Sequence, residues 1–160
     1  MNFVMPERFA ALTGEDIAGL TGLEQLQRIA DGRLPAPPIS RTFRYYLDSV
    51  AEGKAVFIGR PSADFLNPLG TVHGGWAATL LDSALACAVH ATLGVGESYT
   101  TLEFKVNCVR PILPDTGDLT CTGSIVHRGR TTATSEASLV DAAGKLFAHG
   151  TETCLIFPAR

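Results

Sequence analysis

Hydrophobic and polar positions alternate along the second half of the chain in a way that is typical of β-strands. Between residues 101 and 108 every second residue is polar, which predicts a strand with one face in solvent and one face in the core. Three further β-rich runs follow after short turns, at 118–127, 130–141 and 145–157. Earlier in the chain, 41–50 and 54–59 flank a Glu-Gly turn and predict a β-hairpin. The second half is therefore expected to form an antiparallel meander.

Two segments have helical patterns instead. Residues 76–93 are rich in Ala and Leu and apolar on nearly every side, so we expect a helix that is buried around most of its circumference. In residues 14–31, apolar side chains recur every three positions, which predicts one short amphipathic helix that ends at Gly32. Pro35, Pro37 and Pro38 then predict an extended, non-helical linker directly before the sheet.

Together these elements predict the fold class. A helix that is apolar on most sides needs apolar surface around it, and one antiparallel sheet, built from the hairpin and the meander, can wrap it. We therefore expect an α+β chain with the hot-dog fold, in which the sheet surrounds one long central helix. The expected organisation is a helical N-terminal extension at 1–34 and a single hot-dog domain at 35–160.

Composition and charge narrow the function. The formal net charge is -3 and the Lys and Arg residues are scattered, so neither nucleic acid nor an anionic membrane is an expected partner. The N-terminus lacks a basic region followed by an apolar run, and later apolar runs are interrupted, which predicts a cytoplasmic protein. The four cysteines are far apart and form no C-x-x-C pair, which argues against a zinc site or a redox dithiol.

The segment at 67–75, Asn-Pro-Leu-Gly-Thr-Val-His-Gly-Gly, opens the predicted buried helix. The first turn of a helix presents unbonded N–H groups and the positive end of the helix dipole. Gly74 and Gly75 would let the backbone approach a substrate, so that the Gly74 amide stabilises an oxyanion. The alternative is that the two glycines only allow tight packing.

Asp82 is the one carboxylate within this apolar helix. A carboxylate in such surroundings is expected to have a polar partner, to be protonated or to take part in catalysis, because burying an unpaired charge is costly. It could bond a neighbouring strand, or it could act as general base or nucleophile in acyl transfer. His73 and Asn67 lie just before the helix and are expected to position the loop rather than carry protons.

The spacing of these groups predicts a shared site. Asp82 follows Gly74 by eight positions, which places the two about 12 Å apart along a helix. One thioester cannot touch both, whereas a general base must lie within about 3 Å of the attacking water. We therefore expect a second subunit to complete the site across a two-fold interface, in a homodimer that pairs further into a homotetramer.

The run N-P-L-G-T-V-H-G-G-W-A-A-T-L-L-D resembles the PaaI-like hot-dog thioesterases, the acyl-CoA thioesterase 13 type. Residues 101–111, 127–130 and 143–151 are similar to later segments of that family, so the resemblance covers residues 34–157. It implies hydrolysis of an acyl-CoA, in which CoA is part of the substrate and no cofactor or metal is needed.

The resemblance also implies roles for individual residues. Asp82 would be the general base or nucleophile, the Gly74 amide the oxyanion donor, and Asn67 and His73 the accompanying polar pair. Thr101 would help to hold the attacking water, although the alignment could slip to Thr100. Arg128 and Arg130 could contact the CoA phosphates. The acyl pocket could be lined by Tyr45, Tyr46, Phe65, Leu66 and Trp76, which suit an aryl-acyl or a short or medium fatty acyl group.

Two other functions compete with hydrolysis. Hot-dog hydratases use an Asp and a His together, and a second His at a suitable spacing is not evident here. A non-catalytic acyl-CoA-binding protein would keep the fold but lose the carboxylate or carry a DNA-binding segment, for which the helix at 14–31 is too short and acidic.

Overall fold

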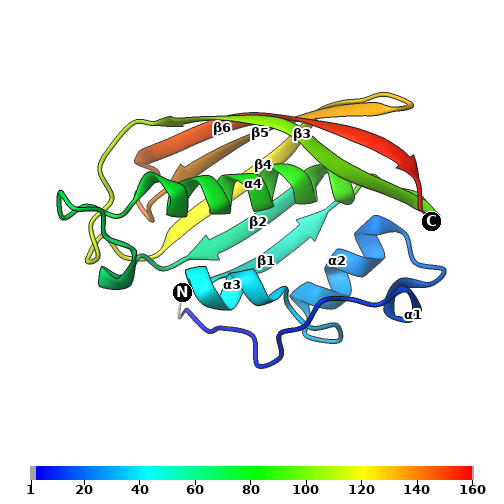
Figure 1. The fold of residues 1–160 in the computed structure, drawn as a ribbon, viewed down its shortest axis with the longest axis horizontal. Helices are drawn as coiled ribbons and strands as arrows, with labels where there is room; N and C mark the ends of the chain where they lie inside the picture. The colour runs from blue at the N-terminus through cyan, green and yellow to red at the C-terminus, as the bar shows by residue number, and fades with distance from the viewer. Residues whose placement is uncertain (1–2, 160) are drawn as a thin grey trace.

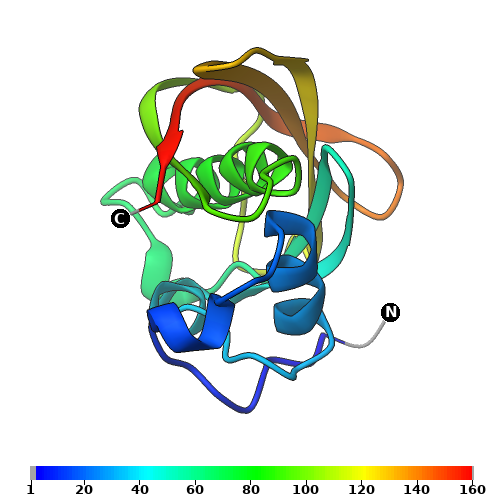
Figure 2. The ribbon, with the colours of Figure 1, turned by 90° about the vertical axis from the view of Figure 1, so that its right-hand side faces the viewer.

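The computed structural model describes residues 3–159 and has at its centre helix α4 (Gly74–His90), enclosed by a six-stranded antiparallel sheet (Figure 1). The strands are β1 (Tyr45–Ala51), β2 (Lys54–Gly59), β3 (Glu97–Cys108), β4 (Leu119–Arg128), β5 (Thr132–Val140) and β6 (Leu146–Pro158). They lie in the order β1-β2-β4-β5-β6-β3. Figure 2 looks along α4 and shows the sheet curving around it. The predicted hot-dog fold is confirmed.

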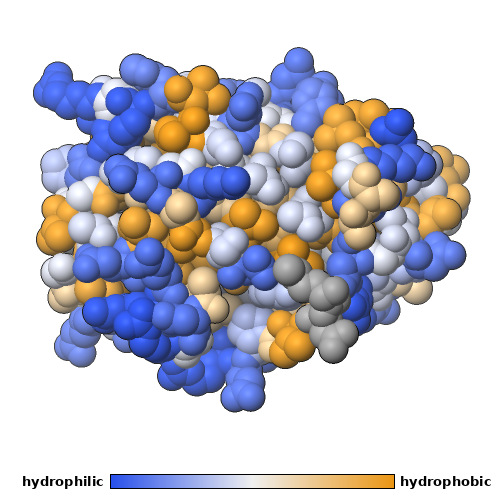
Figure 3. Space-filling model, turned by 180° about the vertical axis from the view of Figure 1, so that it is seen from behind, coloured by the Kyte–Doolittle hydropathy of each residue, from blue (hydrophilic) through white to orange (hydrophobic). Residues whose placement is uncertain are grey.

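Alternation along the strands places small and apolar residues against α4. In β5, Ala133, Ser135, Ala137 and Leu139 are buried on the face toward the helix, while the alternate residues are more exposed. Within residues 3–159 no helix has both the length and the apolar character that crossing a membrane would require. Seen from behind, the molecule shows apolar side chains in several groups among polar ones (Figure 3).

Gly123 in β4 sets how closely the sheet approaches the central helix. A Cβ atom at this position would lie 2.1 Å from the backbone oxygen of Ala84 in α4. Backbone cannot move aside as a flexible side chain does, so Gly123→Ala should cost about 1–3 kcal/mol of folding free energy. We expect a clear fall in Tm by thermal unfolding. Gly14→Ala is the control, because a Cβ there meets nothing within 4 Å; equal Tm values for the two variants would contradict this packing.

The N-terminal segment departs from the sequence prediction. The single helix expected at 14–31 is wrong, because the segment forms two helices, α1 (Gly14–Ile17) and α2 (Gly22–Ala30). Gly19 between them has a positive φ of 72°, which a continuing helix does not adopt. Each helix begins with its own capping box, formed by Thr13 with Asp16 and by Thr21 with Glu24. The second box marks a new helix start, although the apolar periodicity continues across it.

The linker prediction also needs correction. Pro38 is the first residue of a short helix, α3 (Pro38–Phe43), so the proline-rich segment is not wholly extended. Proline fits this position because the first helical residue has no intrahelical N–H bond to lose. Consequently the sheet starts at Tyr45 rather than at residue 41. A 3-10 turn, η1 (Ala63–Phe65), then leads into the loop before α4.

Strand β3 forms one edge of the sheet and pairs only with β6. The expectation of one dry face on this strand is wrong, since Leu102 and Phe104 are 57% and 42% exposed. A register shift between Thr101 and Glu103 interrupts the alternation, and no strand formed by residues 3–159 covers the outer edge. β3 therefore presents a long unpaired edge with exposed apolar side chains, which soluble proteins seldom leave uncovered.

Candidate active site

The loop before α4 is held in shape by Asn67. Its side-chain nitrogen donates to Thr71 Oγ1 at 2.8 Å, and its Oδ1 accepts from the backbone N–H of Leu69 at 2.9 Å. The Asn67 backbone N–H also donates to the backbone carbonyl oxygen of Thr71 at 2.8 Å. Asn67 does not bond the imidazole of His73. The side chain of Asn67 instead bonds residues of its own loop.

His73 caps the N-terminus of α4. Its Nδ1 accepts a hydrogen bond from the Gly75 N–H at 2.9 Å, so the neutral ring carries its proton on Nε2. A Cβ at position 75 would come within 2.9 Å of that same nitrogen. Glycine at 75 therefore leaves room for the cap, and the Gly75 amide is already used by His73.

The amide of Gly74 remains available. Gly74 is the first residue of α4 and is exposed, and its N–H donates to no acceptor within residues 3–159. Here the unpaired N–H groups and the positive end of the helix dipole favour a bound negative charge. Because His73 takes the next amide, Gly74 is the donor at this helix start that an oxyanion can use.

Asp82 lies further along α4 and is half-buried. Its carboxylate has no hydrogen-bond or ion-pair partner among residues 3–159, so nothing in the described chain offsets its partial removal from water. Burial raises the pKa of Asp82 above its ordinary value. A carboxylate with a raised pKa is a better base at neutral pH than an ordinary one.

Thr101 in β3 turns its side chain inward and donates from Oγ1 to Glu152 Oε1 at 2.7 Å. The neighbouring Thr100 is exposed, so Thr101 is the better placed of the two threonines considered above. Burial, and in addition the negative charge of Asp82, raise the pKa of Glu152. Asp82, Glu152 and Thr101 therefore belong to one cluster beside α4, although sequence reasoning did not single out Glu152.

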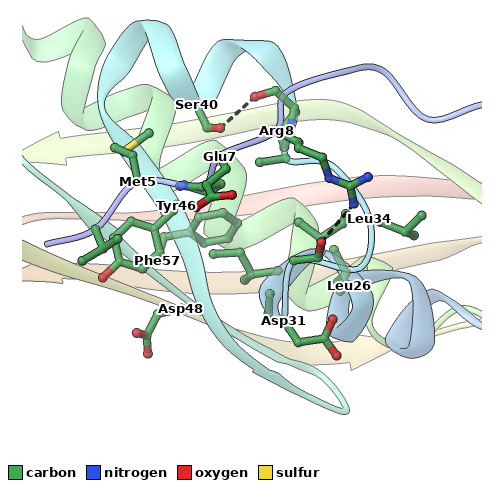
Figure 4. A pocket seen from close by; sticks show the side chains of 18 of the residues that line it. Met5, Glu7, Arg8, Leu26, Asp31, Leu34, Ser40, Tyr46, Asp48 and Phe57 are labelled. Carbon is green, nitrogen blue, oxygen red and sulfur yellow. Dashed lines mark hydrogen bonds between the residues drawn. The ribbon is translucent and has the colours of Figure 1, made fainter.

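Two cavities flank α4. One, of about 340 Å³, is lined by Asn67, Gly74 and Arg110 among others and so opens at the predicted oxyanion donor. A larger one, of about 490 Å³, lies between the N-terminal segment, α2 and β1–β2 (Figure 4). It contains none of the predicted catalytic residues. We place the candidate site at the smaller cavity, which Arg110 also lines, a cation that sequence reasoning missed.

No group of three His, Cys, Asp or Glu side chains that could hold a metal ion is found among residues 3–159.

A model of the thioesterase superfamily matches residues 69–148, which is half of the chain and includes the end of the loop before α4, all of α4 and all of β3. The chain belongs to the thioesterase superfamily. The family match contains Gly74, Asp82 and Thr101, whereas Asn67 and Glu152 lie just outside it.

Individual members of the superfamily support the same assignment. Human acyl-coenzyme A thioesterase 13 is 30% identical over 112 residues, which cover 67% of this chain and 76% of its own. A Halobacterium salinarum protein whose name proposes an esterase is 38% identical over 88 residues, 54% of this chain, and the match spans just over half, 56%, of that relative. The structure of a phenylacetic acid degradation-related protein from Ralstonia eutropha is 31% identical with a TM-score of 0.73, covering 81% of this chain and 98% of its own. The resemblance to PaaI-like thioesterases is confirmed.

Some residues that were expected to contact the substrate are buried in the core or engaged in an ion pair. Trp76 is only 1% exposed, and its indole N–H donates to the backbone carbonyl oxygen of Phe43 at 2.8 Å. It is therefore a core residue. Arg128 is engaged by Glu97 at 2.7 Å, which leaves it less free for a phosphate. Arg130 is exposed to solvent. Of the five residues suggested for the acyl pocket, only Tyr46 lines either cavity described above.

Proposed function

We propose that this protein hydrolyses acyl-CoA thioesters to the free acid and CoA. The observation that carries the proposal is the pairing, on one helix, of a free N-terminal amide at Gly74 with an unpaired carboxylate of raised pKa at Asp82. Electrophilic and basic groups of this kind are what acyl transfer to water requires. The similarity to human acyl-coenzyme A thioesterase 13 supports CoA as the thiol.

The proposed reaction begins with water held by Asp82 and Thr101. Asp82 takes a proton as the water oxygen bonds the thioester carbon, and the carbonyl electron pair moves to oxygen, where the Gly74 amide stabilises it. The oxyanion then collapses, the carbon–sulfur bond breaks, and the proton on Asp82 passes to the departing thiolate. We favour this general-base route over nucleophilic attack by Asp82. The Thr101 hydroxyl donates its hydrogen to Glu152, so the lone pairs of its oxygen can accept a hydrogen bond from a water molecule.

The remaining site residues would bind and orient. His73 and Asn67 fix the loop and hence the direction of the Gly74 amide. Arg130 is exposed, and Arg110 borders the cavity at Gly74, so both are placed to meet CoA phosphates. The acyl group is proposed to be aryl-acyl or short to medium fatty acyl; the Ralstonia relative, named for phenylacetic acid degradation, supports the aryl class.

A second copy of the chain is proposed to complete the site. Gly74 and Asp82 are separated by about 12 Å along α4, and neither cavity contains both residues. The unpaired edge of β3, with Leu102 and Phe104 exposed, offers a surface on which the same edge of another copy can pair. A homodimer joined there would bring the Gly74 of one subunit toward the Asp82 of the other, and dimers would then pair into the tetramer.

One assay separates this function from its alternatives. A panel of aryl-acyl and C2–C12 acyl-CoAs is incubated with the protein, and free thiol is measured; the proposal predicts thiol release from at least one of them. An enoyl-CoA is followed in parallel by loss of its conjugated absorbance. Absorbance loss without thiol would indicate a hydratase, and saturable acyl-CoA binding without either change would indicate a binding protein.

A further inference from the structure

Glu152 in β6 is a carboxyl group in an unusual position. It is 1% exposed and lies on the face of the sheet toward α4, between the buried Gly150 and Cys154. No Lys, Arg or His forms an ion pair with it among residues 3–159. Its Oε2 is buried without any hydrogen-bond partner in that part of the chain. Such a group lowers the stability of the folded chain, because its hydrogen bonds with water are lost and not replaced. A group with this cost is a candidate for a functional role.

The other oxygen of Glu152 has a specific partner. Oε1 accepts the Thr101 hydroxyl at 2.7 Å and the Cys154 thiol at 3.0 Å. A threonine hydroxyl has one hydrogen to donate and two lone pairs that accept. Since the hydrogen of Thr101 is directed to Glu152, both lone pairs of its oxygen are left to accept hydrogen bonds from elsewhere.

We propose that Glu152 is a positioning residue of the active site, which holds the Thr101 hydroxyl as an acceptor for the water that Asp82 activates. One water hydrogen then bonds Thr101 and the other bonds Asp82, so the water lone pair points toward the thioester carbon. This inference rests on the proposed hydrolysis. It adds a group that acts through Thr101 and does not itself touch the substrate.

The protonation of Glu152 suits this role. Burial raises the pKa of Glu152 above its ordinary value; the hydrogen bonds from Cys154 and Thr101 oppose this shift, and the negative charge of Asp82 adds to it. An uncharged carboxyl still accepts the Thr101 hydrogen on Oε1.

The same two strands provide a matched control. On their opposite face, Thr153 Oγ1 of β6 donates to Glu103 Oε1 of β3 at 2.8 Å, in a pair of the same chemical kind that is exposed. Thr153 lies on β6, away from α4 and from the β3 edge proposed as the dimer interface, so removing its hydroxyl should leave the activity unchanged. Any general effect of removing a Thr–Glu bond between β3 and β6 is therefore measured by Thr153→Val.

The test uses full-length protein and an acyl-CoA that wild type hydrolyses. Glu152→Met should lower kcat by about 10- to 100-fold, while Tm stays equal or rises because an unsatisfied buried carboxyl has been removed. Glu152→Gln, which keeps an acceptor oxygen, should retain most of the wild-type kcat. Combining Glu152→Met with Thr101→Val should cost no more than Thr101→Val alone, since Glu152 acts through that hydroxyl.

Several results would overturn the proposal. Equal kcat values for Glu152→Met and Thr153→Val would show that Glu152 has no part in the reaction. Fully additive losses in the double variant would show that it does not act through Thr101. A Glu152→Met chain that fails to fold would make Glu152 a structural residue. Each of these leaves the proposed hydrolysis standing, whereas a wild-type chain that releases no thiol would refute the function itself.

Discussion

Asp82→Asn is expected to lower kcat/KM for acyl-CoA hydrolysis by about 10²–10⁴-fold, which is the usual contribution of a positioned general base. Asparagine has nearly the same shape but cannot take a proton from water. The half-buried carboxylate has no partner within residues 3–159, so its replacement breaks no hydrogen bond in the described chain. Thiol release measured at saturating and at limiting substrate would show the loss mainly in kcat.

The stability of this variant provides the control. Burial raises the pKa of Asp82 in the folded chain, so ionising it costs folding free energy at any pH above the ordinary Asp range. Asp82→Asn should therefore be at least as stable as wild type at pH 7, and the difference should vanish at a pH below about 3.9, where the unfolded carboxyl is protonated as well. A variant that is inactive because it is less stable would contradict this account.

The wild-type pH profile should reflect the same group. Because the base form of Asp82 is the active one, kcat/KM should fall as pH is lowered, with a midpoint above the ordinary Asp value of about 3.9. Asp82→Asn should lack this acidic limb in whatever residual activity remains. A wild-type profile that is flat down to the ordinary Asp pKa would argue that Asp82 is not the base.

Gly74→Pro is expected to lower kcat by about 10²–10³-fold by removing one backbone N–H. Proline is tolerated at the first residue of a helix, and His73 already has the extended backbone, φ -59° and ψ 136°, that a residue before proline prefers. The substitution should therefore delete the proposed oxyanion donor without disturbing α4.

Gly74→Ala is the matched comparison. It adds a Cβ that would make an ordinary contact of 3.6 Å with Cys108 Sγ, and it keeps the N–H. Its loss of kcat should be far smaller than that of Gly74→Pro. Equal losses in the two variants, with unchanged circular dichroism, would mean that bulk at position 74 matters and that the amide does not stabilise the oxyanion.

Much of the fold could be predicted from the sequence, because the relevant signals are local. The apolar run of α4 and the alternation in β4, β5 and β6 placed these elements within a few residues of their observed bounds. Errors arose where a weaker local signal competed with a stronger pattern. The capping box at Thr21 divides the N-terminal helix, although the apolar spacing runs through it.

The candidate site was predictable only in part. Gly74, His73 and Asp82 are close in sequence, so one motif reveals them together. Glu152 is fifty-one positions from its partner Thr101 and lies in a Thr-Glu-Thr run that suggests an exposed strand. The ion pair between Arg128 and Glu97 likewise joins two strands, and Trp76 is buried by contacts that no local pattern specifies. Such long-range contacts needed the folded chain.

The central claim is that each site combines Gly74 of one subunit with Asp82 of another, and isolated hybrid dimers test it most directly. Asp82→Asn and Gly74→Pro chains with different affinity tags are co-expressed, and dimers that carry both tags are purified. One of the two sites then has both groups intact, so the hybrid should have roughly half of the wild-type kcat per dimer, although each parent is nearly inactive. Hybrid dimers as inactive as both parents would contradict the shared site.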